Sequence, residues 1–183
     1  MSLFHKVRQD QAPDILSVLV EISEGDYNKY EFNHEYGVLE LDRVLYGPLF
    51  YPVNYCDVPG TWNDGDNDPL DALLFSSKSI VPGALVKGRV IGALEMIDNG
   101  EVDHKIVCVN AKDPRFDHVH SMDDLTPYQR KDVTTFFELY KIPQTGRDTV
   151  KVGKFMSKKE AAEFIQQCIK AYTEKFSDIE RML

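Results

Sequence analysis

Cysteine is scarce in this chain of 183 residues, which contains Cys56, Cys108 and Cys168 only. The three are widely spaced, their number is odd, and no two of them form a CxxC pair. Disulfide scaffolds and cysteine-rich zinc sites need paired or closely spaced cysteines, so neither is expected here. Thiols of this kind are typical of a reducing compartment, and we expect a cytoplasmic protein.

Long apolar runs and excess positive charge are also missing. No stretch approaches the ~18 apolar residues of a membrane-spanning helix, and the N-terminal MSLFHKVRQD lacks the apolar core of a signal peptide. The formal net charge is −9, which argues against binding to nucleic acid backbones. We therefore expect neither a membrane nor a nucleic acid as partner. An anionic small molecule would need metal ions to supply local positive charge.

Internal repeats and flexible linkers are absent as well, and 43% of the residues are hydrophobic. This length and composition predict a single domain over residues 1–183. Alternating or β-branched runs predict strands at 15–22, 29–33, 37–45, 71–75, 84–97 and 105–110.

The first predicted strand has one exception to its apolar pattern. Alternation places Leu16, Val18, Val20 and Ile22 on one face. Glu21 interrupts this run, and a charge at such a position needs a partner. Lys29, Arg43 or a metal-bound water are the candidate partners.

The last third of the chain predicts helices. Thr126-Pro127-Tyr128-Gln129 is a capping box with proline at the first helical position, and its helix is expected to run toward Tyr140. Ser157-Lys158-Lys159-Glu160 is a second capping box. An apolar stripe at helical spacing follows it, at Ala161, Phe164, Ile165, Cys168, Ile169, Tyr172 and Phe176. Strands followed by helices favour an α+β fold, with a sheet or small barrel flanked by helices.

The stretch DGDNDPLDALLF at 64–75 crowds four aspartates ahead of an apolar run. Carboxylates are the ligands that hard divalent cations prefer. In an extended segment Asp66 and Asp68 would share a face, and a bend at Pro69 would return Asp71 to the same site. A solvated acidic turn is the plainer interpretation, which the adjoining buried strand makes less favourable.

Several other motifs are excluded. An EF-hand counted from Asp64 would need glycine and glutamate where Pro69 and Phe75 stand. A phosphatase of the haloacid-dehalogenase type needs an apolar strand before its DxD, whereas residues 59–63, PGTWN, resemble a loop. The chain has no GxxxxGK[ST], HExxH or GxSxG motif, which removes P-loop, zinc-protease and serine-hydrolase chemistry.

The acidic stretch is one of several motifs that agree with a known family. DNDPLDA at 66–72 matches the pattern Asp-x-Asp-Pro-apolar-Asp of family I soluble inorganic pyrophosphatases, which the chain resembles. Further segments agree in the same order along residues 15–141. They are Glu21 in LVEIS, Lys29-Tyr30-Glu31, Arg43 in LDRVL, YPVNY at 51–55, Asp98 and Asp103 before Lys105, Asp117-His118, and FFELYK at 136–141.

The resemblance implies a closed five-stranded OB-like barrel flanked by helices, and hydrolysis of inorganic pyrophosphate to two phosphates with several Mg²⁺ ions. It implies direct in-line attack by a metal-activated water, without a phosphoenzyme. The residues that it implies for metal binding are Asp66, Asp71, Asp98, Asp103 and Glu31. Those for phosphate contact are Lys29, Arg43, Lys105, Tyr140 and Lys141. Asp68 is implied as general base, Tyr55 as a further active-site residue and Glu21 as a supporting one.

Plainer structural roles are open to several of these residues. They are exposed strand alternation for Lys29 and Glu31, a surface ion pair for Arg43, a helix end for Tyr140 and Lys141, and a hairpin turn for Asp98 before Asn99-Gly100.

Competing functions and the assembly are also open. A non-catalytic acidic module that binds divalent cations would explain the aspartates but not the accompanying lysines and arginine. An OB-type nucleic acid binder has the wrong net charge. Homo-oligomerisation is expected, as a hexamer or a trimer. The choice between the two is open, because Thr135 and Leu139 stand where many bacterial members have histidines that help to join trimers into hexamers. Cys56 replaces the glycine that commonly follows YPxNY.

Overall fold

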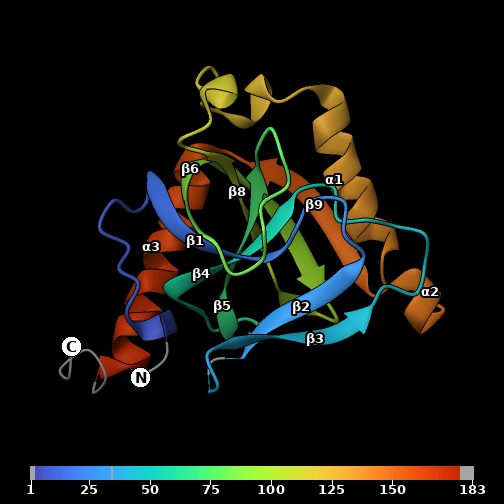
Figure 1. Cartoon of the computed structure of the whole chain (residues 1–183), viewed down its shortest axis with the longest axis horizontal. Helices are drawn as coiled ribbons and strands as arrows, with labels where there is room; N and C mark the ends of the chain where they lie inside the picture. The colour runs from blue at the N-terminus through green and yellow to red at the C-terminus, as the bar shows by residue number, and fades with distance from the viewer. Residues whose placement is uncertain (1–2, 34, 178–183) are drawn as a thin grey trace.

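A closed barrel of five strands forms the centre of the molecule, in a computed structural model that describes residues 3–33 and 35–177 (Figure 1). Neighbouring strands pair in the order β1-β4-β5-β8-β6, and β6 pairs again with β1, which closes the ring. Of these pairs, β5 and β8 run parallel and the others antiparallel. The barrel strands are β1 (Ile15–Ile22), β4 (Asn54–Asn63), β5 (Asp68–Phe75), β6 (Leu85–Asp98) and β8 (Lys105–Asn110). The predicted five-stranded barrel is confirmed.

Four further strands extend this barrel. β7 (Glu101–Val102) and β9 (Val150–Met156) both pair with β6. β2 (Asn28–Asn33) and β3 (Val38–Val44) form a separate antiparallel hairpin. In Figure 1 this hairpin lies beside one end of the barrel, below α1 and α2.

The inner face of the barrel is filled by one apolar cluster. This cluster takes residues from all five barrel strands, including Cys56, Ala72 and Ile106 on three neighbouring strands. A second cluster also takes residues from all five strands, and the two lie on opposite faces of the barrel wall because side chains alternate along each strand. In the first cluster every strand residue is at most 1% exposed, as expected inside a closed barrel. Residues of the C-terminal helix α3 (Lys158–Lys175), among them Ile165 and Cys168, belong to the same cluster.

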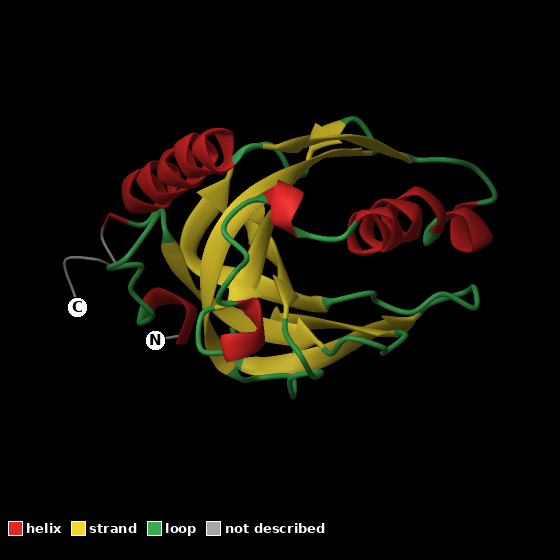
Figure 2. Cartoon of the chain, turned by 90° about the horizontal axis from the view of Figure 1, so that it is seen from above, coloured by secondary structure: helices red, strands yellow, loops and turns green. Residues whose placement is uncertain are grey.

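The outer face carries a second apolar cluster, which joins the barrel wall to helix α1 (Pro127–Leu139) through Val133, Phe136 and Phe137. Figure 2 shows α1 and α3 on different sides of the barrel. Both helices begin at the predicted capping boxes: Thr126 Oγ1 accepts the amide hydrogen of Gln129, and Ser157 Oγ accepts that of Glu160. The predictions for both helices are confirmed.

The remaining elements are short. They are helix α2 (Ile142–Thr145) and the 3₁₀ helices Leu3–His5, Pro114–Phe116 and Met122–Asp124. No helix in the described residues is both long and apolar enough to cross a membrane.

Two parts of the predicted strand layout are wrong. Residues 59–63 are not a loop but the end of β4, in which Gly60 takes a positive φ of 75°. A strand therefore does precede the aspartates, so the loop argument does not exclude a haloacid-dehalogenase-type site. The last third of the chain is also not purely helical, since β9 lies between α1 and α3. Pro59 and Gly60 obscure the strand pattern at the end of β4, and Lys151 and Gly153 obscure it in β9.

Candidate active site

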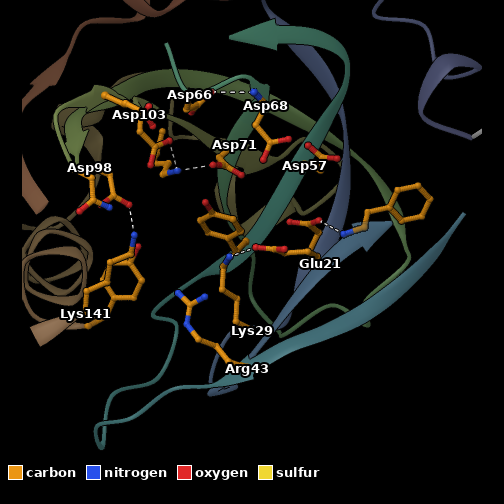
Figure 3. A pocket seen from close by; sticks show the side chains of 17 residues that line it. Glu21, Lys29, Arg43, Asp57, Asp66, Asp68, Asp71, Asp98, Asp103 and Lys141 are labelled. Atoms are coloured by element: carbon orange, nitrogen blue, oxygen red, sulfur yellow. Dashed lines mark hydrogen bonds and ion pairs between the residues drawn. The ribbon is translucent and has the colours of Figure 1, made fainter. Parts of the chain in front are cut away.

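One pocket of about 410 Å³ contains all thirteen residues to which the resemblance assigns a role in the site (Figure 3). It opens between the outer barrel wall, the β2–β3 hairpin and the C-terminal end of α1. The predicted residues that line it are Glu21, Lys29, Glu31, Arg43, Tyr55, Asp66, Asp68, Asp71, Asp98, Asp103, Lys105, Tyr140 and Lys141. The structure thus brings together side chains from positions 21 to 141 of the sequence.

The floor of the pocket is the outer face of β4, β5 and β8. Asp57 on β4 lies opposite Asp71 on β5, which lies opposite Lys105 on β8. Their neighbours in sequence, such as Ala72 and Ile106, belong to the barrel core. Because side chains alternate along each strand, the apolar ones pack inside the barrel and the ionisable ones line the pocket on its outer face.

Glu21 lies on the same face at a β-bulge in β1, which turns the next residue, Ile22, outward as well. The pairing with β4 shifts register between Val20 and Ile22. As a result, Val20 belongs to the barrel core, while Ile22 belongs to the outer cluster and Glu21 lines the pocket. The prediction that Ile22 shares a face with Val20 is wrong, because the pattern does not reveal the extra residue.

Glu21 has a backbone partner that the sequence did not suggest, and the charge of Lys29, one of the expected partners, also acts on it. Glu21 Oε1 accepts a hydrogen bond from the backbone N–H of Phe32, at 2.7 Å, and this links β1 to the β2–β3 hairpin.

The aspartate-rich turn at 64–67 brings Asp66 to the pocket. Asn67 takes a positive φ of 59°, and the carboxylate of Asp66 accepts the amide hydrogen of Asp68. The chain therefore bends before Asp68, and the predictions of an extended segment and a bend at Pro69 are wrong. Pro69 lies within β5.

Close packing holds this turn against β7. A Cβ on Gly65 would lie 2.7 Å from the carbonyl oxygen of Val102, and Asn63 Nδ2 donates to the same oxygen at 2.9 Å. This contact sets the acidic turn beside the segment that carries Asp98 and Asp103. Those two aspartates flank the Asn99-Gly100 turn, where both turn residues have positive φ, and the amide of Asp103 bonds back to the Met96 carbonyl. Asp98 is thus both a hairpin residue and a pocket residue.

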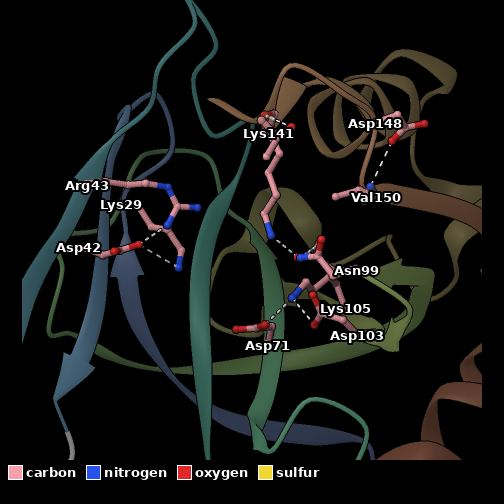
Figure 4. A network of polar contacts seen from close by, with 12 residues as sticks. Lys29, Asp42, Arg43, Asp71, Asn99, Asp103, Lys105, Lys141, Asp148 and Val150 are labelled. Atoms are coloured by element: carbon pink, nitrogen blue, oxygen red, sulfur yellow. Dashed lines mark hydrogen bonds and ion pairs between the residues drawn. The ribbon is translucent and has the colours of Figure 1, made fainter. Parts of the chain in front are cut away.

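Cationic side chains enter from the opposite walls (Figure 4). Lys29 and Arg43 face each other across the β2–β3 ladder, and both pair with Asp42. Lys141 follows α1 and pairs with Asp98. Part of the plainer interpretation of Arg43 therefore holds, since it has a neighbouring acidic partner.

Lysine ammonium groups lie between carboxylates that the resemblance assigns to metal binding. Lys105, whose side chain is only 3% exposed, pairs with both Asp71 and Asp103. Burial disfavours its ammonium, but these two carboxylates outweigh that effect and raise the pKa of Lys105. Lys29 pairs with Glu31 in the same way. Among the described residues, no three histidines, cysteines or acids are arranged as a ready metal cage.

Burial and mutual repulsion raise the pKa of several pocket carboxyls. Burial and the charge of Asp71 raise the pKa of Glu21 to about 8. Burial and Asp71 raise the pKa of Asp68, which faces the open pocket, to about 7. Burial, the charge of Asp103 and a hydrogen bond with Asp103 raise the pKa of Asp66 to about 7. The pocket therefore holds more negative charge than its own cations neutralise.

The composition of the lining fits divalent cations. Nine carboxylates and four cationic side chains line the pocket, and histidine and cysteine are absent from its described lining. Oxygen donors without nitrogen or sulfur suit hard ions such as Mg²⁺. The crowding of acids supplies the attraction that such ions need.

Four lining residues were missed from the sequence, namely Phe32, Asp57, Asn99 and Glu101. Asp57 is the most consequential, since it is 5% exposed and burial with the Glu21 charge raises its pKa. Its position two residues after Tyr55 would have placed it on the same face, had β4 been recognised as a strand.

Comparison with known proteins agrees with this geometry. A family model described as inorganic pyrophosphatase matches residues 18–173. The inorganic pyrophosphatase of Geobacillus stearothermophilus is 42% identical over 161 residues, which are 88% of this chain and 96% of the relative. The crystal structure of the Thermus thermophilus inorganic pyrophosphatase superposes with a TM-score of 0.89 at 36% identity, and covers 94% of this chain and 99% of that one. The Helicobacter pylori enzyme superposes with a TM-score of 0.86 at 37% identity, over 92% of this chain and 99% of that one. The chain belongs to the inorganic pyrophosphatase family.

Proposed function

We propose that this protein hydrolyses inorganic pyrophosphate to two phosphates in the pocket described above, with Mg²⁺ as its divalent cation. The observation that carries the proposal is the composition of the pocket, in which carboxylates from β1, β5 and the acidic turn face lysines and an arginine from the opposite walls. Divalent-metal dependence is general for this family. Bound cations would cancel the charge of the substrate and lower the pKa of a water.

The carboxylates fall into groups by their position. Asp66, Asp71 and Asp103 surround the Lys105 ammonium or adjoin it, and we assign the tightest cation to them. Asp98 and Glu31 line other parts of the pocket, where Lys141 and Lys29 pair with them. We assign cations that arrive with the substrate to these two residues together with Asp103.

The cationic and hydroxyl side chains would bind the phosphates. Arg43 Nε is buried without a hydrogen-bond partner among the described residues, so a donor there is free for an anion. Lys29 lies opposite Arg43 on the same hairpin. Lys105, Tyr140 and Lys141 line the other side of the pocket. Donors on both sides would orient a two-phosphate anion for in-line attack.

Asp68 is our candidate for the general base. Its carboxylate faces the pocket, and a pKa of about 7 lies near the working pH, as general base catalysis requires. Tyr55 lines the same pocket, is 8% exposed, and has the Lys105 ammonium 5.5 Å from the centroid of its ring. Burial raises the pKa of Tyr55, so its neutral hydroxyl would serve as a donor or support.

We also infer a single functional domain over residues 1–183 that acts as a homo-oligomer, trimer or hexamer, in the cytoplasm. The exposed aromatic side chains of Tyr27, Tyr46 and Phe50 support association, and the three free cysteines support a reducing compartment. Light scattering during gel filtration would give the mass of the assembly.

Phosphate release from pyrophosphate and from ATP, with Mg²⁺ and with a chelator, tests the main proposal. We expect Mg²⁺-dependent release from pyrophosphate and little from ATP, because the pocket accommodates two phosphates between opposed donors. Cation binding without any phosphate release would instead indicate a non-catalytic divalent-cation-binding module.

A further inference from the structure

The pocket contains a buried carboxylate, that of Asp57, to which the proposed mechanism assigns no role. Asp57 is 5% exposed and lines the pocket. Figure 3 shows its side chain beside those of Asp68, Asp71 and Glu21. The charges of Glu21, Asp71 and Asp68 all act on it. Asp57 is therefore part of the site and not of the protein surface.

Its position opposite Asp71 is unusual for two acids. The two residues face each other across the β4–β5 ladder. Cβ atoms of directly opposed residues lie about 4.5–5.5 Å apart, and like charges placed there destabilise a sheet. The same separation allows two carboxylates to share one cation. The pairing is unfavourable without a bound cation and favourable with one.

Asp57 has a backbone hydrogen bond with Val58, and the other acids of this region also have partners within the protein. Glu21 is fixed by the backbone N–H of Phe32, and Asp71 shares the Lys105 ammonium with Asp103. Neighbouring strands β1, β4 and β5 each present one acid, namely Glu21, Asp57 and Asp71. Because affinity for a hard cation rises with the number and charge of its oxygen ligands, a third strand carboxylate would strengthen the site.

We propose that Asp57 is an additional carboxylate of the cation site at Asp71 and that it raises the affinity of the pocket for a divalent cation. This inference rests on the proposed function in assigning a cation to Asp71. It extends that proposal by adding a residue from β4, a strand that supplies no other carboxylate to the pocket among the described residues.

Calorimetric titration of Mg²⁺ and of Mn²⁺ into chelator-stripped protein tests the role directly. We expect Asp57→Asn to bind the tightest cation about 10-fold more weakly than the wild type. Asp57→Ala, which also removes the oxygen, should bind at least as weakly. Asp64→Asn is the matched control, since Asp64 is exposed and lies outside the pocket lining. Unchanged affinity in both Asp57 variants would overturn the proposal.

Melting temperatures separate this role from a purely structural one. In chelator, Asp57→Asn should melt at or above the wild-type temperature, because it removes a like charge opposite Asp71. The increase in melting temperature on adding Mg²⁺ should be smaller than in the wild type. A lower melting temperature in chelator together with the full Mg²⁺ increase would mean that Asp57 is structural.

The outcome is distinguishable from that of the proposed function. Pyrophosphate hydrolysis by the wild-type protein tests the function alone. If the wild type released no phosphate but Asp57→Asn still bound cations more weakly, the function would fail and the role of Asp57 would stand. If the wild type were active and Asp57→Asn bound cations normally, the proposed function would stand and the role of Asp57 would fail.

Discussion

Carboxylates in the pocket and carboxylates at the helix ends have opposite pKa shifts. Burial and the Asp71 charge raise the pKa of Glu21 to about 8 and that of Asp68 to about 7. Hydrogen bonds from Ser157 lower the pKa of Glu160 to about 2, and those from Ser77 lower the pKa of Asp113 to about 2. The chemical group is the same, so the difference lies in what surrounds it.

The carboxylates at the helix ends accept hydrogen bonds from nearby serines, whereas those in the pocket have few such donors. Glu160 accepts from the N–H and hydroxyl of Ser157, which stabilise its charged form within the protein itself. The pocket acids instead face one another, and their few lysines are shared, as Lys105 is between Asp71 and Asp103. The helix-end acids therefore stabilise the fold alone, whereas the pocket acids need ions from solution.

The largest expected effect comes from removing the ionisable group of Asp68. Asp68→Asn should lower kcat about 10²–10⁴-fold, because the amide cannot accept a proton from the attacking water. Phosphate release from pyrophosphate with saturating Mg²⁺ measures it, and Asp64→Asn is the control. Cation binding by Asp68→Asn should be largely retained. Wild-type kcat in this variant would remove Asp68 from the mechanism.

Removing the buried ammonium group of Lys105 should destabilise the metal-free protein. Lys105→Met leaves Asp71 and Asp103 buried without their ammonium, and breaking such a buried pair costs about 3–5 kcal/mol. Urea unfolding in chelator measures this loss, and saturating Mg²⁺ should restore part of it. Lys158→Met, which breaks the exposed pair with Asp14, should change stability by less than ~1 kcal/mol. Equal losses in the two variants would contradict the comparison.

Cations should stabilise the whole protein by relieving repulsion in the pocket. At a Mg²⁺ concentration 100 times Kd, binding to the folded state alone adds about 2.7 kcal/mol to the free energy of unfolding. Thermal melts in Mg²⁺ and in NaCl of matched ionic strength measure this. An identical melting temperature in both salts would show that the pocket acids do not hold Mg²⁺.

The smallest expected effect concerns a helix-end carboxylate. Ser157→Ala should cost about 1 kcal/mol at pH 7, because it removes the N-cap of α3. The pKa of Glu160 is lowered from 4.5 to about 2 in the folded state, so the stability that this lowered pKa contributes is present above pH 4.5 and is lost as the pH falls toward 2. The difference in free energy of unfolding between the wild type and Ser157→Ala should therefore become smaller as the pH falls toward 2. Ser157→Thr, which keeps the hydroxyl, should follow the wild type, and a gap that is constant with pH would contradict the assignment.

Local patterns in the sequence predicted the elements with regular signals. Alternation identified β1, β2, β3, β5, β6 and β8, and the capping boxes fixed the starts of α1 and α3. The motif agreement identified thirteen residues that converge on one pocket. The strand β4 was missed because Pro59 and Gly60 indicate a turn, and β9 because Lys151 and Gly153 obscure its alternation.

Features that depend on pairing between strands could not be predicted. Nothing in ILSVLVEI marks the register shift after Val20. Asp57 could have been placed on the face of Tyr55 once β4 was recognised as a strand, but its position opposite Asp71, fourteen residues later, depends on the register of the β4–β5 ladder. The turn that brings Asp66 to Asp103 depends on the contact of Gly65 with Val102.

The bulge in β1 makes the length of a strand, and not only its composition, a determinant of activity. Glu21 is the one residue between Val20 and Ile22, so deleting it would restore a regular ladder with β4 and the chain would still close its barrel. The same deletion would remove the carboxylate near Asp71 and its tether to the Phe32 amide. A well-folded but poorly active protein is the expected product of that single deletion.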